Sequence, residues 1–394
     1  MIFSKRTDWK LTPNEISLSL SELKKQGKEI IDLTESNPTL SKFKYPQEPI
    51  LKGLASKDHL LYDPAPRGID SARAAVSAYY QENGLYVDPQ QIFLTSSTSE
   101  AYSFLFRLLT NPGDHIAVGR PSYPLFDFLA QINDVEVDPY SLVFKNGQWA
   151  IDVKQLEEKI GEKTRAIVLV SPNNPTGSFV KKNELQDIFK ICQERNIALI
   201  CDEVFSDYRL RGDSSLQANF VNNTQILTFS LSGISKVLGL PQMKLGWIVA
   251  SGPKEDVAIA AERLEVILDT FLSVNTPAQN ALKAWLSIKP QIQKEILIRI
   301  KANEAFLRKS LEGHSSCRYL PPEGGWYAVL RLPNNKTEED WVVEFLQKDC
   351  VFVHPGYFFD FEDEPYIVLS LLPEEEKFRQ GITRILSRIA GEKS

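Results

Sequence analysis

Short, continuously apolar runs recur along the middle of the chain. Helical, amphipathic stretches such as Glu184 to Arg195 separate several of these runs. The runs span residues 92–94, 116–118, 166–170, 197–201, 226–229 and 245–250. Strands that are apolar on both faces and alternate with helices are typical of a mostly parallel sheet covered by helices on both sides. The middle of the chain is therefore predicted to be an α/β layer structure, in which one strand can be antiparallel.

The pattern changes after Gly252. Residues 254–313 are largely helical, with a break at Asn275-Thr276-Pro277, and include a long helix expected to connect two domains. Residues 317–391 have the pattern strand, strand, helix, short strand, strand, helix, which predicts a smaller α+β unit. Near the start, helical periods cover residues 14–27 and 69–83.

These patterns predict three segments. Residues 1-45 form an N-terminal arm and part of the small domain, residues 46-285 form a large cofactor-binding domain, and residues 286-394 form a small C-terminal domain. A chain of 394 residues is long enough for more than one domain.

Composition narrows the class of protein. A net charge of -6, with no run rich in lysine and arginine, argues against a nucleic-acid partner. No apolar run is long enough to span a bilayer, and residues 1–15 lack the apolar core of a signal peptide. Four cysteines lie far apart and four histidines show no metal-ligand spacing, which favours buried thiols and no metal site. We therefore expect a cytoplasmic protein that binds neither membranes nor metals.

Polar residues with unusual chemistry follow four of the predicted strands. In open α/β sheets, ligands bind beyond the carboxyl ends of the strands, so these residues are expected to converge on one site. The four strand ends are Thr95 to Glu100, Ser171 to Gly177, Asp202 to Phe205, and Ser230 to Gly239.

Each strand end has a functional and a structural interpretation. Lys236 is either a surface lysine on a loop or a lysine that forms a Schiff base with a carbonyl group. The hydroxyl run that includes Ser97 opens a helix and can hold a phosphate, although Thr98 or Ser99 can also be a plain helix cap. Asp202 ends an apolar run, and a buried carboxylate needs a cationic partner such as a protonated ring nitrogen.

Two further residues are held stiffly by prolines. Asn174 is a hydrogen-bond donor between Pro172 and Pro175, and Tyr123 can stack on a flat ring. A phosphate site, a carboxylate for a ring nitrogen, a stacking aromatic and a Schiff-base lysine are together the demands of pyridoxal phosphate.

The order and spacing of these motifs identify a family. Over nearly its full length the chain resembles the fold-type I pyridoxal-phosphate-dependent aminotransferases of class I/II. The motifs that carry the resemblance are Tyr62 and Gly68, Thr95 to Ala101, Asn111 to Asp114, Pro121 to Pro124, Asn174 to Gly177, Asp202-Glu203, Ser235-Lys236, Gly324 to Tyr327, and Pro355-Gly356.

The resemblance implies a large domain with a mostly parallel seven-stranded sheet flanked by helices, plus a smaller α+β domain. It also implies a homodimer with shared active sites, in which Tyr62 reaches the phosphate bound by the partner subunit. Lys236 then forms the aldimine with pyridoxal 5'-phosphate and moves the substrate proton, and Asp202 keeps the ring nitrogen protonated. Asn174 would bond the ring hydroxyl and Tyr123 would stack on the ring.

Residues expected to hold the phosphate, and residues that flank Lys236, depart from the family pattern. By resemblance, Ser97 and Thr98 hold the phosphate, but Lys244 stands where the family usually has arginine and loses the bidentate fork. Gly233 stands in place of a serine, for which Ser232 or Ser235 can substitute.

Two further departures concern the ring hydroxyl and the substrate. Phe205 replaces a tyrosine that bonds the ring hydroxyl. Val368 falls where the family usually has the arginine that pairs with the substrate carboxylate. That carboxylate is then bound otherwise, or the donor lacks it. The candidate groups for binding it are Asn174, Arg120, Lys42, Lys44 and backbone N–H groups near Ser36.

These observations predict an aminotransferase that moves an amino group between an amino acid or amine and a 2-oxo acid. The alternatives are a carbon–sulfur β-lyase or decarboxylase of the same fold, and a non-catalytic regulator. Four aromatic residues indicate an apolar or aromatic pocket, namely Phe126, Phe128, Trp326 and Tyr357. Core packing explains Phe126 and Phe128 equally well.

Overall fold

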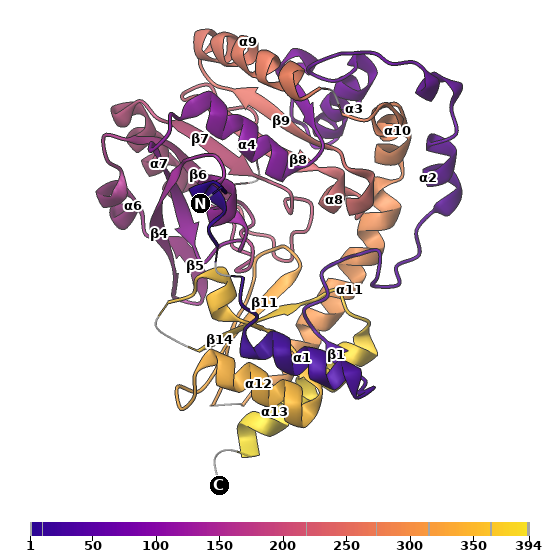
Figure 1. Ribbon diagram of the computed structural model, residues 1–394, viewed down its shortest axis with the longest axis vertical. Coiled ribbons are helices and arrows are strands. Elements are labelled where there is room, and N and C mark those ends of the chain that lie inside the picture. Colours follow the sequence, from indigo (N-terminus) through magenta and orange to yellow (C-terminus); the bar gives the residue numbers. More distant parts are fainter. Residues whose placement is uncertain are drawn as a thin grey trace.

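Figure 1 shows the computed structural model of the protein, which describes residues 2–9, 11–217, 219–272, 274–313, 316–362 and 365–391. A large sheet covered by helices occupies the upper part of the view, and a smaller sheet with its own helices lies below. The predicted α/β layer and smaller α+β unit are confirmed. The boundaries after residues 45 and 285 stay predictions, and His314 lies outside the described residues.

The large sheet has the strand order β2-β9-β8-β7-β6-β3-β4-β5. The bounds are β2 Ile92–Thr95, β3 His115–Arg120, β4 Glu136–Lys145, β5 Gln148–Ile151, β6 Thr164–Val170, β7 Ala198–Asp202, β8 Thr228–Gly233 and β9 Gly246–Ser251. Strands β8, β7, β6, β3 and β4 are parallel neighbours, whereas β9 is antiparallel to both β2 and β8, and β5 is antiparallel to β4. Over the residues that the structure describes, this sheet has eight strands, so the expected number of seven is wrong.

A hairpin of β4 and β5 lies at the edge of this sheet. Its turn is Asn146-Gly147, whose φ angles of 53° and 82° lie in the left-handed region that these two residue types tolerate best. Strand β4 is only partly buried and contains Pro139, so it has no continuous apolar run. The Asn-Gly pair was the sequence signal for this hairpin.

Alternate residues of the central strands point to opposite faces of the sheet. On β6, Val168 packs into an apolar cluster beneath α4 and α9, and its neighbour Leu169 packs into a second cluster beneath α6 and α7. The same alternation occurs on β7, where Ile200 and Cys201 face the two clusters. This burial on both faces explains the continuous apolar runs.

The described chain also contains α-helices. Their bounds are α1 Glu15–Lys25, α2 Gln47–Gly53, α3 Asp70–Gln81, α4 Thr98–Leu109, α5 Phe126–Gln131, α6 Val153–Lys159, α7 Lys182–Arg195, α8 Ile234–Val237, α9 Lys254–Phe271, α10 Thr276–Ser287, α11 Lys289–Ser310, α12 Glu338–Asp349 and α13 Glu375–Gly391. The predicted break lies between α9 and α10, where the Asn275 side chain caps the N-terminus of α10. Within the described ranges, no helix is long and apolar enough to cross a bilayer.

The smaller unit contains a four-stranded antiparallel sheet in the order β10-β11-β14-β13. A separate parallel pair joins β1 to β12. The bounds are β1 Ile31–Asp32, β10 Arg318–Leu320, β11 Tyr327–Arg331, β12 Val351–Phe352, β13 His354–Pro355 and β14 Tyr366–Ser370. The pairing of β1 with β12 brings the N-terminal segment onto this unit, and the long helix α11 runs from the large sheet down to it (Figure 1).

Candidate active site

One cavity of ≈ 290 Å³ lies where the predicted strand ends meet. Residues that follow β2, β6, β7 and β8 line it, together with residues from the smaller unit. The lining is Ser36, Ser97, Thr98, Ser99, Tyr102, Tyr123, Phe126, Leu129, Val170, Asn174, Asp202, Val204, Phe205, Gly233, Ser235, Lys236, Lys244, Leu245, Gly246 and Tyr327. Its volume is close to that of small-molecule sites.

Lys236 lies on the short helix α8, directly after β8. Its Nζ atom is 5.6 Å from the centre of the Phe205 ring and 5.5 Å from the Trp326 ring. The Tyr208 hydroxyl donates a 2.7 Å hydrogen bond to the carbonyl oxygen of Lys236 and so fixes its backbone. Burial lowers the pKa of Lys236 against the opposing attraction of Asp202. A lowered pKa raises the fraction of neutral amine, which is the nucleophilic form.

Asp202 is the last residue of β7, and its side chain is buried. Its carboxylate accepts hydrogen bonds from the Tyr102 hydroxyl and the Val204 N–H, each at 3.1 Å. Burial raises the pKa of Asp202 to about 6. Among the described residues Asp202 forms no ion pair, so the site offers a buried carboxylate to a cationic ligand.

The N-terminus of α4 forms a further part of the cavity wall. The N-cap of α4 is Ser97, whose Oγ accepts a hydrogen bond from the Glu100 N–H at 3.1 Å. The alternative prediction, in which Thr98 or Ser99 is the helix cap, is therefore wrong. Thr98 and Ser99 therefore keep their hydroxyls for the cavity. Lys244 lines this cavity too, so a cation accompanies a helix N-terminus, an arrangement that favours a phosphate.

Asn174, Tyr123 and Tyr327 complete the cavity wall. Asn174 follows β6, and its Oδ1 atom is buried without a hydrogen-bond partner in the described structure. Tyr327 is the first residue of β11, and hydrogen bonding by the nearby Ser36 and Asn174 side chains lowers the pKa of its phenol against the larger opposing effect of burial. Tyr123 is 40% exposed and lines the cavity, so part of it is open to a ligand.

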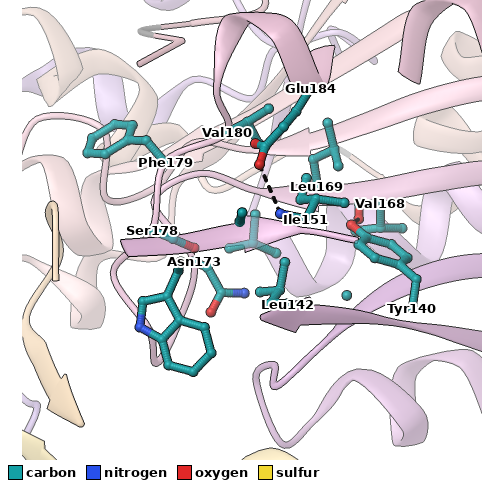
Figure 2. A pocket seen from close by; sticks show the side chains of 14 residues that line it. Tyr140, Leu142, Ile151, Val168, Leu169, Asn173, Ser178, Phe179, Val180 and Glu184 are labelled. Atoms are coloured by element: carbon teal, nitrogen blue, oxygen red, sulfur yellow. Dashed lines mark hydrogen bonds between the residues drawn. The ribbon is translucent and has the colours of Figure 1, made fainter. Parts of the chain in front are cut away.

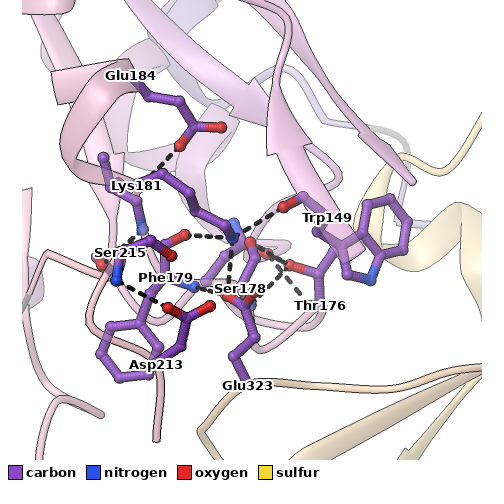
Figure 3. A network of polar contacts seen from close by, with 12 residues as sticks. Trp149, Thr176, Ser178, Phe179, Lys181, Glu184, Asp213, Ser215 and Glu323 are labelled. Atoms are coloured by element: carbon purple, nitrogen blue, oxygen red, sulfur yellow. Dashed lines mark hydrogen bonds and ion pairs between the residues drawn. The ribbon is translucent and has the colours of Figure 1, made fainter. Parts of the chain in front are cut away.

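A buried ion pair secures the loop that carries Trp326 and Tyr327. Figure 3 shows Lys181 beside Glu323, with 2.8 Å between Nζ and Oε2. The same ammonium group donates to the carbonyl oxygens of Trp149 and Phe179, so all three of its N–H bonds are used. The ion pair therefore ties the loop after β6 to the segment that precedes β11.

A second, enclosed space lies between β5, β6 and the start of α7. Figure 2 shows Tyr140, Leu169 and Glu184 around it, with Glu184 accepting a hydrogen bond from the Ile151 N–H at 2.9 Å. Its volume of ≈ 20 Å³ has room for about one water molecule. Asn173 is the one residue of the four predicted strand ends among its described lining residues, and Lys236 and Asp202 do not line it, so we interpret it as a packing void.

Tyr62 and Arg120 lie outside the cavity lining. Tyr62 is 68% exposed. Arg120 forms ion pairs with Asp127 and Asp360 and donates to the Ser122 hydroxyl. Its guanidinium is thus engaged away from the cavity.

Of the residues that depart from the family pattern and the four aromatic candidates, some line the cavity and others do not. Lys244, Gly233 and Phe205 line the cavity, whereas Val368 is fully buried in an apolar cluster with Trp149 and Val329. Two lysines considered for the carboxylate, Lys42 and Lys44, are absent from the described lining, as are three of the four aromatic candidates. Only Phe126 of those four lines the cavity.

Sequence reasoning missed the roles of Tyr102 and Tyr327. Tyr102 is four residues after Thr98, so the helical period places both on one face of α4, and this spacing was the available signal. Tyr327 lies within a motif that carried the resemblance, but its contact with Ser36 joins residues far apart in sequence. No local pattern encodes such a contact.

The cavity fits pyridoxal 5'-phosphate. The α4 N-terminus and Lys244 suit a phosphate, and the buried carboxylate of Asp202 suits a protonated ring nitrogen. The Lys236 amine suits an aldehyde, and the unpartnered Asn174 Oδ1 offers an acceptor.

Comparison with known proteins agrees with this geometry. The family described as aminotransferase class I and II matches residues 28–385. The glutamate-pyruvate aminotransferase AlaA of Haemophilus influenzae is 25% identical over 374 residues, 92% of this chain and 91% of that protein. The tyrosine aminotransferase of Mus musculus is 26% identical over 77% of this chain and 68% of its own length. The structure of an alanine aminotransferase from Pyrococcus furiosus superimposes with a TM-score of 0.89 at 24% identity, covering 99% of this chain and 100% of that one, and shows the shared fold.

Proposed function

The chain belongs to the aminotransferase class I and II family and is therefore a pyridoxal-phosphate-dependent aminotransferase, and we propose that the cavity around Lys236 is its active site. The observation that carries this proposal is the meeting of Lys236 and Asp202 in one cavity. The amino group moves between an amino acid and a 2-oxo acid. Membership of this family favours the aminotransferase reaction over the three alternatives, which are a β-lyase, a decarboxylase and a non-catalytic regulator.

The bound cofactor supplies an aldehyde carbon that combines with amines and a ring that accepts the electron pair left at the substrate α-carbon. Lys236 presents its neutral amine to the cavity, and its Nζ then carries the proton removed from that α-carbon. Asp202 holds a proton on the ring nitrogen through its buried carboxylate. With the cofactor bound, Tyr123 would cover one face of its ring. The rings of Phe205 and Trp326, which lie beside the Lys236 amine, would shield it from water.

The phosphate is assigned to the α4 end of the cavity. Ser97, Thr98 and Ser235 provide hydroxyl or backbone donors there, and Lys244 provides the charge. Asn174 is assigned to the ring hydroxyl. Arg120 has no place in this proposal, because its ion pairs hold it away from the cavity.

Two wider proposals accompany the site. We propose a homodimer in which the exposed Tyr62 of each subunit contributes to its partner's site. Sedimentation analysis tests the dimer, and a mixture of Tyr62→Phe subunits with Lys236→Ala subunits tests the sharing. A cytoplasmic location is supported by the four cysteines, which are free thiols of the kind that a reducing compartment preserves.

A half-reaction screen tests the function. Reconstituted protein is mixed with single amino donors, including alanine, glutamate and tyrosine, and the visible absorbance of the cofactor is followed. Amino transfer converts the cofactor to its amine form and releases the 2-oxo acid of the donor. A β-lyase would release pyruvate and ammonia, and a decarboxylase would release carbon dioxide, so either product with an unchanged cofactor would contradict the proposal.

A further inference from the structure

Neutral hydrogen-bonding groups form the wall of the cavity that belongs to the smaller unit. Ser36 follows β1 and Tyr327 begins β11, and Asn174 faces them from the end of β6. The cations among the described lining residues are Lys236 and Lys244. Both have tasks under the proposed function, on which this inference rests, because one reacts with the cofactor and the other holds its phosphate.

Within the described structure, no arginine lines this wall of the cavity. Arg120 is held by two carboxylates, those of Asp127 and Asp360. On the neighbouring strand β14, Val368 is fully buried and packs against apolar side chains. A substrate carboxylate that enters the cavity therefore has only neutral donors available at this end.

Tyr327 brings a phenol, which can donate a hydrogen bond, to this wall. The side chains of Ser36 and Asn174 lie close enough to its phenol to lower its pKa by hydrogen bonding, and all three residues line the cavity. Burial raises the pKa of Tyr327 to about 12, which keeps the phenol protonated at neutral pH. Because the residue lines the cavity, that O–H is available to a ligand.

We propose that Tyr327 is the residue that recognises the carboxylate of the amino donor, through a hydrogen bond from its phenol. Ser36 and Asn174 are positioning residues for that phenol. A hydrogen bond from a neutral phenol to a charged group discriminates less strongly than a bidentate arginine, so removal of the phenol is expected to weaken carboxylate recognition roughly tenfold to a hundredfold.

The test uses Tyr327→Phe with two donors that differ in one group. Phenylalanine carries the carboxylate, and 2-phenylethylamine lacks it. Tyr357→Phe is the matched control, because Tyr357 lies on the same smaller unit but outside the cavity lining. Each holoenzyme is first compared by its visible cofactor absorbance, which shows whether the variant folds and loads.

The half-saturating concentration of phenylalanine is expected to rise roughly tenfold to a hundredfold in Tyr327→Phe, while that of 2-phenylethylamine stays unchanged. The unreactive carboxylate 3-phenylpropionate, titrated calorimetrically, is expected to bind more weakly by a similar factor. Equal effects on both donors, no effect on either, or a wild-type enzyme that uses only the amine would overturn the inference. A wild-type enzyme that converts no donor at all contradicts the proposed function instead, and the calorimetric titration then still decides the role of Tyr327.

Discussion

The hydroxyl of Tyr102 donates a 3.1 Å hydrogen bond to Oδ2 of Asp202, and both side chains are buried. Tyr102 lies on α4, whose N-terminus is assigned to the phosphate, and Asp202 ends β7. The bond therefore links the helix assigned to the phosphate with the carboxylate assigned to the ring nitrogen. The Tyr102 and Val204 donors lower the pKa of Asp202 but do not cancel the effect of burial, which raises it to about 6.

This balance predicts how the stability of the cofactor-free protein depends on pH. Burial favours protonated Asp202, since its pKa of about 6 in the folded protein exceeds the value of about 3.9 for an exposed aspartate. Stability is thus lost as the pH rises through this interval, when the buried carboxyl ionises. Asp202→Asn is expected to raise the free energy of unfolding at pH 8 by about 2–3 kcal/mol relative to wild type, and by little at pH 4. Denaturant titrations at both pH values measure the difference, and an equal effect at both would disagree with the assignment.

Phe205→Tyr is expected to lower the pH midpoint of the visible cofactor band by about one unit. Phe205 lies 5.6 Å from the lysine amine. A phenol at this position gives the ring hydroxyl oxygen a donor, which favours its ionised form. A spectrophotometric pH titration of the two holoenzymes tests this, and a midpoint that stays put or rises argues against Phe205 as a neighbour of the ring.

Lys244→Ala is expected to weaken cofactor binding roughly tenfold to a hundredfold, because the phosphate loses a charge-assisted hydrogen bond. Lys42→Ala is the matched control, since both lysines have a positive φ and Lys42 pairs with Glu374 at the surface. Equilibrium dialysis gives the affinities. Similar losses in the two variants would show that Lys244 does not hold the phosphate.

The Lys181–Glu323 pair is expected to stabilise the junction between the loop after β6 and the segment that precedes β11. Their side chains are only 7% and 10% exposed, so removal of one partner leaves a buried charge. Glu323→Gln or Lys181→Met is expected to cost about 3–5 kcal/mol of unfolding free energy, and the double variant less than the sum. A double-mutant cycle by chemical denaturation measures the coupling, and strictly additive losses would mean that the pair is not coupled.

Regular patterns predicted much of the fold. Apolar runs marked β3, β6 and β7 because these strands are buried on both faces. The same patterns missed β4, whose residues are only partly buried, and with it the eighth strand β5. A hairpin at a sheet edge needs no continuous apolar run.

The candidate site could also be predicted only in part. Lys236 and Asp202 follow predicted strands, so the sheet topology was enough to bring them together. The Tyr327 contacts with Ser36 and Asn174 depend on how the smaller unit packs against the large sheet. The engagement of Arg120 by Asp360 joins residues 240 positions apart, and no local pattern encodes it.

The identity of the reactive lysine is the central claim, and chemical trapping tests it most directly. Holoenzyme is reduced with borohydride, digested, and searched by mass spectrometry for the lysine that carries the reduced cofactor. The account predicts the added mass on Lys236 and its loss in Lys236→Ala, with Lys244 unlabelled in both. Label on Lys244 or any other lysine of the wild-type protein, or no label at all, would contradict the account.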